Sequence, residues 1–325
     1  MQAFEYANPS TLHAALALLG SKWGEADVLA GGTDQISLMK EYIHTPKRVV
    51  NIKGIKELHG VHSSAQGLVI GAAVTFDELA SNAAVRSEYP SLHAAVLGVS
   101  SPQIRNMGTA GGDLCQRPRC WYFRRGFGLL AMKDGKSLVP NGDNRYHAIF
   151  GGGPAYFVSA SSLGPALVAL GAKVKLVSPS GQRVVAVEKF FVSPPNESSR
   201  EVALLPSEIL TEIQVPSANG VKNATYEVRH KEALDWPLVT ASVALHMKGP
   251  NIGSASVVLG HVAPTPWVAT KANAALSGKA LNDETIEQAA QASTDGAQPL
   301  SESEYKVKLA RVAVKRALHA ASGKA

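Results

Sequence analysis

Two pairs of adjacent glycines, each close to a threonine and an aspartate, are the residues best suited to binding chemistry. The first pair, Gly31 and Gly32, follows the apolar stretch 26–30 and precedes Thr33 and Asp34. Because glycine lacks Cβ and adopts positive φ readily, the chain can turn sharply there and bring its amides close to a ligand. Successive amides in such a turn suit phosphate oxygens. The pattern predicts an anion cradle between a strand and a helix, or simply a turn.

The second pair, Gly111 and Gly112, lies between Thr109 and Asp113. Two such segments predict that the chain holds both ends of a long phosphate-bearing ligand, and a dinucleotide such as FAD fits that description. Neither segment matches the G-x-G-x-x-G fingerprint, and neither carries the Lys-Ser/Thr of a Walker loop. A Rossmann fold is therefore disfavoured.

The two aspartates beside these glycines have different expected roles. Asp34 precedes a stretch with helical apolar spacing, so it is expected to be the N-cap of that helix. Asp113 cannot donate a hydrogen bond when it is ionised. If Asp113 faces a pyrophosphate, its carboxylate must point elsewhere or accept from a backbone amide.

The two glycine segments resemble those of the FAD-binding medium subunit of the molybdenum hydroxylases, the family of xanthine dehydrogenase, CO dehydrogenase and aldehyde oxidoreductase. That family carries an Ala-Gly-Gly-Thr-Asp type segment before a Met-Lys helix, here Met39 and Lys40. It also carries an Arg-Asn-x-Gly-Thr-x-Gly-Gly-Asn-Leu type segment, here residues 105–114. The likeness extends over nearly the whole chain, and residues 115–123 resemble the subgroup found with bacterial aldehyde oxidoreductases.

The resemblance implies an α+β fold in two domains. Residues 1–217 would form the two-subdomain FAD-binding fold of the vanillyl-alcohol-oxidase/PCMH type, with a loop insert near 115–142. Residues 218–325 would form a C-terminal domain of sheet plus helices, like that of the CO dehydrogenase flavoprotein. The polar, glycine-containing stretch 217–220 suits a boundary between the two.

The glycine segments and the resemblance together predict an FAD site with no catalytic residue and no metal ligand. Thr75 would lie near the flavin and would also suit a helix cap. Asp143, in a Gly-Asp-Asn sequence that also suits a turn, would lie near the adenine end. Lys189 would lie near the flavin or its phosphates, although it could be an ordinary surface group. The predicted cofactor-binding residues are Leu29, Ala30, Gly31, Gly32, Thr33, Asp34, Gln35, Thr75, Gly108, Thr109, Gly111, Gly112, Asp113, Leu114, Asp143 and Lys189.

The insert contains the two cysteines of the chain. In the subgroup that it resembles, a cysteine matching Cys120 and several later cysteines hold a [4Fe–4S] cluster, which usually needs four thiolates. Here residues 127–142 contain no cysteine, so Cys115 and Cys120 stand alone. His147 is an unlikely substitute for a missing thiolate. We therefore expect no iron–sulfur cluster in this chain and a structural role for both cysteines.

Charge and composition argue against several classes of protein. The formal net charge is +6, yet the basic residues are scattered except for Arg117, Arg119, Arg124 and Arg125. No recognition helix or RNA-binding signature accompanies them, so nucleic-acid binding is not expected. No stretch approaches the length of a transmembrane helix, so membrane insertion is not expected, and the N-terminus lacks a signal-peptide pattern. The expected location is the cytoplasm, or the periplasm by co-export with a partner that carries a signal.

The resemblance implies an FAD-carrying electron-transfer subunit. A large molybdopterin-binding partner would oxidise an aldehyde, xanthine or another aromatic heterocycle. A small partner with [2Fe–2S] clusters would pass electrons to FAD, which would hand them to an external acceptor. Two alternatives stay open: a free-standing FAD-dependent oxidase, and a scaffold subunit without flavin. The second is suggested by Asp113 and by residues 161–163, where the family has an aspartate that this chain lacks.

Overall fold

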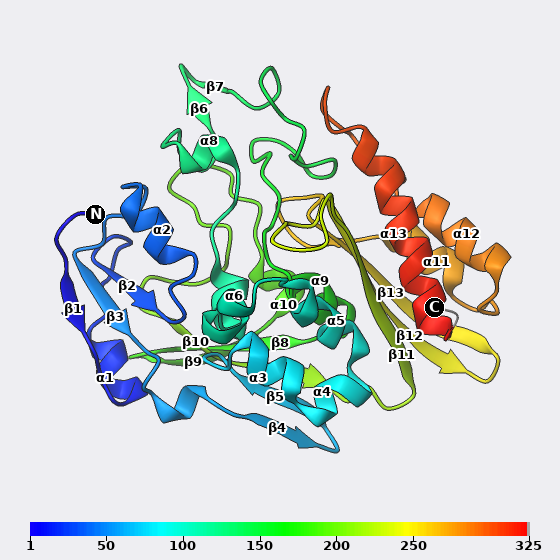
Figure 1. Ribbon diagram of the computed structural model, residues 1–325, viewed down its shortest axis with the longest axis horizontal. Coiled ribbons are helices and arrows are strands. Elements are labelled where there is room, and N and C mark those ends of the chain that lie inside the picture. Colours follow the sequence, from blue (N-terminus) through cyan, green and yellow to red (C-terminus); the bar gives the residue numbers. More distant parts are fainter. Residues whose placement is uncertain (324–325) are drawn as a thin grey trace.

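The computed structural model describes residues 1–323 of the chain. Sheets of three, five and four strands follow one another through these residues. Figure 1 shows the N-terminal strands in blue on one side and the C-terminal helices in orange and red on the other. The insert between them, drawn in green, projects beyond the sheets in the same view.

The first sheet is parallel, and the first glycine segment follows one of its strands. Its elements are β1 (Glu5–Ala7), α1 (Leu12–Ala17), β2 (Ala26–Leu29), α2 (Gln35–Lys40) and β3 (Arg48–Asn51). The strand order is β1-β3-β2, and the helices make the connections between strands that a parallel sheet requires. The first glycine segment is therefore the turn that leads from the end of β2 into α2.

The second sheet is antiparallel and supports most of the short helices. Its elements are η1 (Lys56–Leu58), β4 (Val61–Ser64), β5 (Gly67–Gly71), α3 (Phe76–Ser81), α4 (Ala83–Glu88), α5 (Pro90–Gly98), α6 (Pro102–Met107), α7 (Ala110–Cys115), α9 (Gly164–Ala169), β8 (Lys173–Ser178), β9 (Gly181–Ala186), α10 (Val187–Phe190) and β10 (Ile209–Pro216). The strand order is β4-β5-β10-β8-β9. Helices α3, α4, α5, α7, α9 and α10 share one apolar core with these strands.

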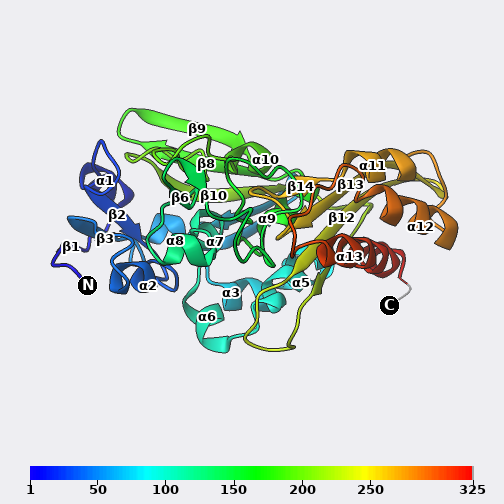
Figure 2. The same cartoon turned by 90° about the horizontal axis from the view of Figure 1, so that it is seen from above.

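The third sheet lies in the C-terminal part. Its elements are β11 (Val221–Val228), β12 (Val239–Lys248), β13 (Asn251–Gly260), β14 (Trp267–Val268), α11 (Thr270–Leu276), α12 (Asp283–Ala292) and α13 (Tyr305–Ser322). Residues 239–245 of β12 are buried without interruption, so both faces of that strand are covered. Helices α5 and α9, which pack on the second sheet, also contact these strands, as do α11 and α13. Figure 2 shows α11, α12 and α13 at the end of the molecule opposite the N-terminal strands.

The insert folds around a small core of its own. Its elements are α8 (Trp121–Arg124), β6 (Met132–Lys133) and β7 (Lys136–Ser137). Phe123 and Leu129 pack with Leu38 of α2, so the insert rests on the helix that follows the first glycine segment. Farther along, Asn144 and Glu302 each donate a backbone amide to the side chain of the other, at 2.9 Å, which fastens the insert to the C-terminal part.

These sheets and helices confirm the predicted α+β fold. The second sheet ends with β10 and the third begins with β11, on either side of the boundary expected after residue 217. Within residues 1–323, no helix is long and apolar enough to span a membrane.

Candidate functional site

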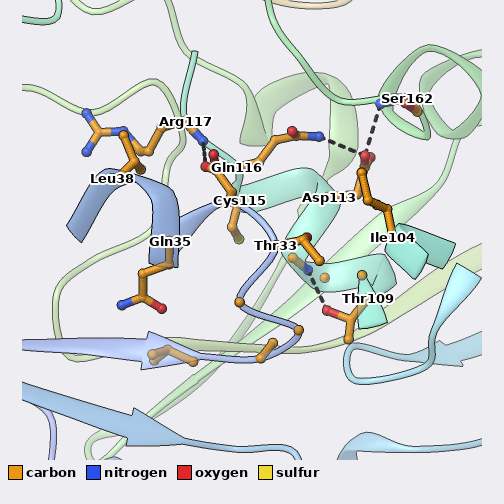
Figure 3. Close-up of a pocket in the computed structure, with 18 of the residues that line it drawn as sticks. Thr33, Gln35, Leu38, Ile104, Thr109, Asp113, Cys115, Gln116, Arg117 and Ser162 are labelled. Carbon is orange, nitrogen blue, oxygen red and sulfur yellow. Dashed lines mark hydrogen bonds between the residues drawn. The ribbon is translucent and has the colours of Figure 1, made fainter. Parts of the chain in front are cut away.

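Both glycine segments line one cavity of about 350 Å³. The cavity lies where the first sheet, the second sheet and the insert meet, and residues 234–237 of the C-terminal part also line it. Figure 3 shows Thr33 of the first segment and Thr109 of the second on neighbouring stretches of the chain. The predicted residues that line the cavity are Ala30, Gly31, Gly32, Thr33, Asp34, Gln35, Gly108, Thr109, Gly111, Gly112 and Asp113.

The first segment presents hydrogen-bond donors without protein partners. Gly32 has a φ of +74°, which places it in the left-handed region that glycine tolerates. The backbone amides of residues 31–35 donate to no other atom of residues 1–323. The buried side-chain nitrogen Nε2 of Gln35 has no partner among these described residues either. Buried polar groups are normally paired, so the Gln35 nitrogen indicates a ligand rich in acceptors, and the free amides beside it are available to the same ligand.

The second segment differs from the first, because it forms the start of helix α7. The Thr109 hydroxyl caps the helix by accepting from the amide of Gly112 at 3.1 Å. The amides of Ala110 and Gly111 donate to the carbonyls of Val74 and Ala72 at 2.8 and 2.9 Å. These amides already have protein partners, so the segment forms a wall of the cavity and not a second cradle.

The Asp113 carboxylate is directed at residues 161–163 and not at the free amides of the first segment. It accepts from the amides of Ser162 and Leu163, at 3.1 and 2.9 Å, and from the hydroxyl of Ser161 at 2.5 Å. Burial raises the pKa of this carboxyl above its ordinary value, and the hydrogen bonds from Ser161 and the two amides oppose the rise. Asp113 thus fastens α7 to residues 161–163.

Asp34 occupies the N-cap position of α2, as predicted, but its side chain makes no capping hydrogen bond. Its carboxylate accepts from the amide of Arg117 and from Nη2 of Arg124, both at 2.8 Å. It also forms an ion pair with Nη1 of Arg119 at 3.1 Å. Two guanidinium groups attract this carboxylate more strongly than the backbone amide of a helix cap would, which explains why it faces the insert.

Sequence reasoning missed two residues that connect the glycine segments. Gln116 donates to Asp113 at 2.9 Å, as Figure 3 shows, and accepts from Nη2 of Arg119 at 3.0 Å. The Arg119 guanidinium also stacks over the ring of Trp236, 4.5 Å from its centroid. One signal was present in the sequence: the only clustered arginines follow directly after the second segment.

Two family models match the chain in succession. The model of the FAD binding domain in molybdopterin dehydrogenase matches residues 2–218, which is two thirds of the chain. The chain belongs to this molybdopterin dehydrogenase flavoprotein family. The model of the CO dehydrogenase flavoprotein C-terminal domain matches residues 224–321. The resemblance inferred from the two glycine segments is confirmed, and so is FAD as the cofactor.

Known members of the family match the chain from end to end. The aldehyde oxidoreductase FAD-binding subunit PaoB of Escherichia coli K12 is 32% identical, over 96% of this chain and 96% of that protein. The carbon monoxide dehydrogenase medium chain of Hydrogenophaga pseudoflava is 28% identical, over 98% of this chain and 96% of that one. A solved structure of carbon monoxide dehydrogenase from Hydrogenophaga pseudoflava superposes with a TM-score of 0.78 at 29% identity, over 99% of this chain and 98% of the matched chain.

The remaining predicted residues do not line the cavity. Leu29 is half-buried and Leu114 is fully buried at its margins. Thr75 forms a capping box with Glu78, which supports the capping role, and it lies beside Thr109 through an isolated β-bridge.

Two further predicted contacts lie elsewhere on the chain. Asp143 is bound to Arg145 at 2.6 Å outside the cavity, and Lys189 is exposed on α10. The FAD site that we propose below leaves both of them out.

The insert holds its cysteines as free thiols. The Cys120 sulfur lies 3.2 Å from Nε2 of His147, and burial lowers the pKa of that histidine to about 4. Burial raises the pKa of Cys115 to about 12. Among residues 1–323, no three His, Cys, Asp or Glu side chains lie close enough to hold a metal ion.

Proposed function

We propose that this chain is the FAD-containing electron-transfer subunit of a heteromeric molybdenum hydroxylase. A molybdopterin-binding large subunit would oxidise the substrate, an aldehyde or an aromatic heterocycle such as xanthine. A small subunit would pass the electrons through [2Fe–2S] clusters, and the flavin site of this chain would deliver them to an external acceptor. The relatives named for aldehyde, carbon monoxide and xanthine oxidation support this proposal.

The observation that carries the proposal is the row of free amides at residues 31–35, which faces a cavity in a chain of this family. Such a row suits the diphosphate of FAD. Bound FAD supplies the redox chemistry, since it can accept electrons from one-electron carriers and release a pair. The residues of this chain hold and orient it, and they limit the access of water.

We also propose where the two domains divide and where the cofactor lies. The FAD-binding domain would comprise residues 1–217, and the C-terminal domain residues 218–325. The cofactor would lie against residues 30–35 and the wall formed by 108–113. Gln116 and Arg119 would complete the site from the insert.

The direct test is to express the chain with and without its genomic neighbours and to measure bound FAD and electron transfer. We expect one FAD per chain, co-purification with a molybdenum subunit, and oxidation of substrate only by the complex. If the isolated chain oxidised substrate without partners, a free-standing oxidase would replace our proposal. If the purified chain lacked the flavin absorption bands, a scaffold role would replace it.

The location of the complex follows from its partners. We place it in the cytoplasm, or in the periplasm if a partner carries an export signal. Fractionation of cells that express all the subunits distinguishes these two compartments.

A further inference from the structure

Three of the clustered arginines, at 117, 119 and 124, differ in their partners. Arg124 donates Nε to the carbonyl of Pro118 at 2.8 Å and Nη2 to Asp34 and to the carbonyl of Arg117. Arg117 lines the cavity, forms an ion pair with Glu201 and contacts Nε2 of His44 at 2.6 Å. Arg117 thus has Glu201 as a carboxylate partner, and Arg124 does not line the cavity.

Arg119 keeps donors to spare. A guanidinium carries five N–H groups. In Arg119, Nη2 donates to Gln116 and Nη1 lies near Asp34, whereas the buried Nε has no partner within residues 1–323. Arg119 lines the cavity together with residues 31–35, but Arg124 does not. Trp236 covers one face of the guanidinium and holds its plane.

Among residues 1–323, Arg119 has no carboxylate of its own. Asp34 is the carboxylate that contacts Arg119, and it is shared with Arg124. The single charge of Asp34 is therefore divided between two guanidinium groups, beside the free amides of the first segment. A guanidinium with spare donors matches the geometry of phosphate oxygens.

We infer that Arg119 binds the diphosphate of FAD, opposite the free amides of residues 31–35. This role deepens the proposed FAD site and rests on it. The insert would then serve the cofactor, with Asp34 and Gln116 positioning the guanidinium and Trp236 fixing its plane.

The test is competition against bound FAD in the full-length chain, with ADP and adenosine as competitors. In the wild type, the preference for ADP over adenosine measures the contribution of the diphosphate. We expect Arg119→Gln to reduce this preference about tenfold and to weaken FAD binding by a similar factor, as expected for one charge-assisted contact. Arg124→Gln is the matched control, because it loses a contact with the same carboxylate from outside the cavity, and its preference should stay within twofold of wild type.

The inference is overturned if Arg119→Gln keeps the wild-type preference for ADP, or if Arg124→Gln loses as much. If Arg119→Gln does not fold, Arg119→Lys decides, because it keeps the charge but loses Nε and the planar fork. A several-fold smaller preference for ADP supports the role, and an unchanged preference overturns it. Failure of wild-type protein to bind FAD would instead refute the proposed function itself.

Discussion

The two glycine segments look alike in sequence and do different work in the structure. In residues 31–35 the amides face the cavity without protein partners, and the following aspartate is turned to the insert. In residues 110–113 the amides donate to the loop that follows β5 and to Thr109, and the aspartate is turned inward. A Gly-Gly-Thr-Asp composition therefore does not by itself mark a ligand cradle. The partners of the amides decide whether it does.

The largest effect that tests this comparison should come from Gly31→Ala. A Cβ on Gly31 would overlap the backbone carbonyl of Met107, which cannot swing aside. We expect the free energy of unfolding, measured by urea titration of the FAD-free chain, to fall by about 3 kcal/mol. Gly112→Ala is the control, because its Cβ would meet only the Thr109 side chain at 2.8 Å. Its loss should stay below about 1 kcal/mol, since alanine is the better helix former.

The two aspartates give the next largest effect. Asp34→Asn removes the charge that faces Arg119 and Arg124, and we expect the free energy of unfolding to fall by about 2 kcal/mol. Asp113→Asn keeps an acceptor for neutral donors, so about 1 kcal/mol should be lost. Urea titration of both FAD-free variants checks the order. A larger loss for Asp113→Asn would contradict the roles assigned here.

The two threonines should separate binding from stability. Thr33 is exposed at the cavity, and we expect Thr33→Ala to weaken FAD binding about threefold with unchanged stability. Thr109→Ala removes a helix cap and should lower the free energy of unfolding by about 1 kcal/mol, with FAD affinity within twofold of wild type. Fluorescence titration with FAD and urea unfolding measure the two quantities. The same pattern in both variants would mean that the segments do not differ.

The smallest effect concerns pH. Burial raises the pKa of Asp113 in the folded chain above its ordinary 3.8. Between the pKa of Asp113 in the unfolded chain and its higher pKa in the folded chain, the folded chain binds more protons. The stability due to Asp113 therefore falls as pH rises through that window. The wild type should lose stability relative to Asp113→Asn over this range, by no more than about 1.4 kcal/mol per pH unit. A difference that is flat or rises with pH would contradict the assignment.

Much of the fold was predictable because it follows from local patterns. Alternating residues on either side of Ser180 and Gly181 favour a hairpin, and β8 pairs with β9 from Lys173 with Ala186 to Ser178 with Gly181. The first segment was correctly placed between a strand and a helix for the same reason.

The site was only partly predictable, because its polar contacts join residues far apart in sequence. Asp34 meets arginines 83 to 90 positions away, and Asp113 meets Ser162 and Leu163 some 50 positions away. Composition reveals neither pairing. Asp34 looked like a helix cap because a cap is a local arrangement, whereas the charges that override it come from the insert.

Hydrogen–deuterium exchange, measured on FAD-free and FAD-loaded protein, shows directly whether the amides of the two glycine segments differ. We expect amides 31–35 to exchange fast without FAD and slowly with it, and amides 110–113 to be protected in both states. Equal gains of protection in both segments, or protection of 31–35 without FAD, would contradict this expectation.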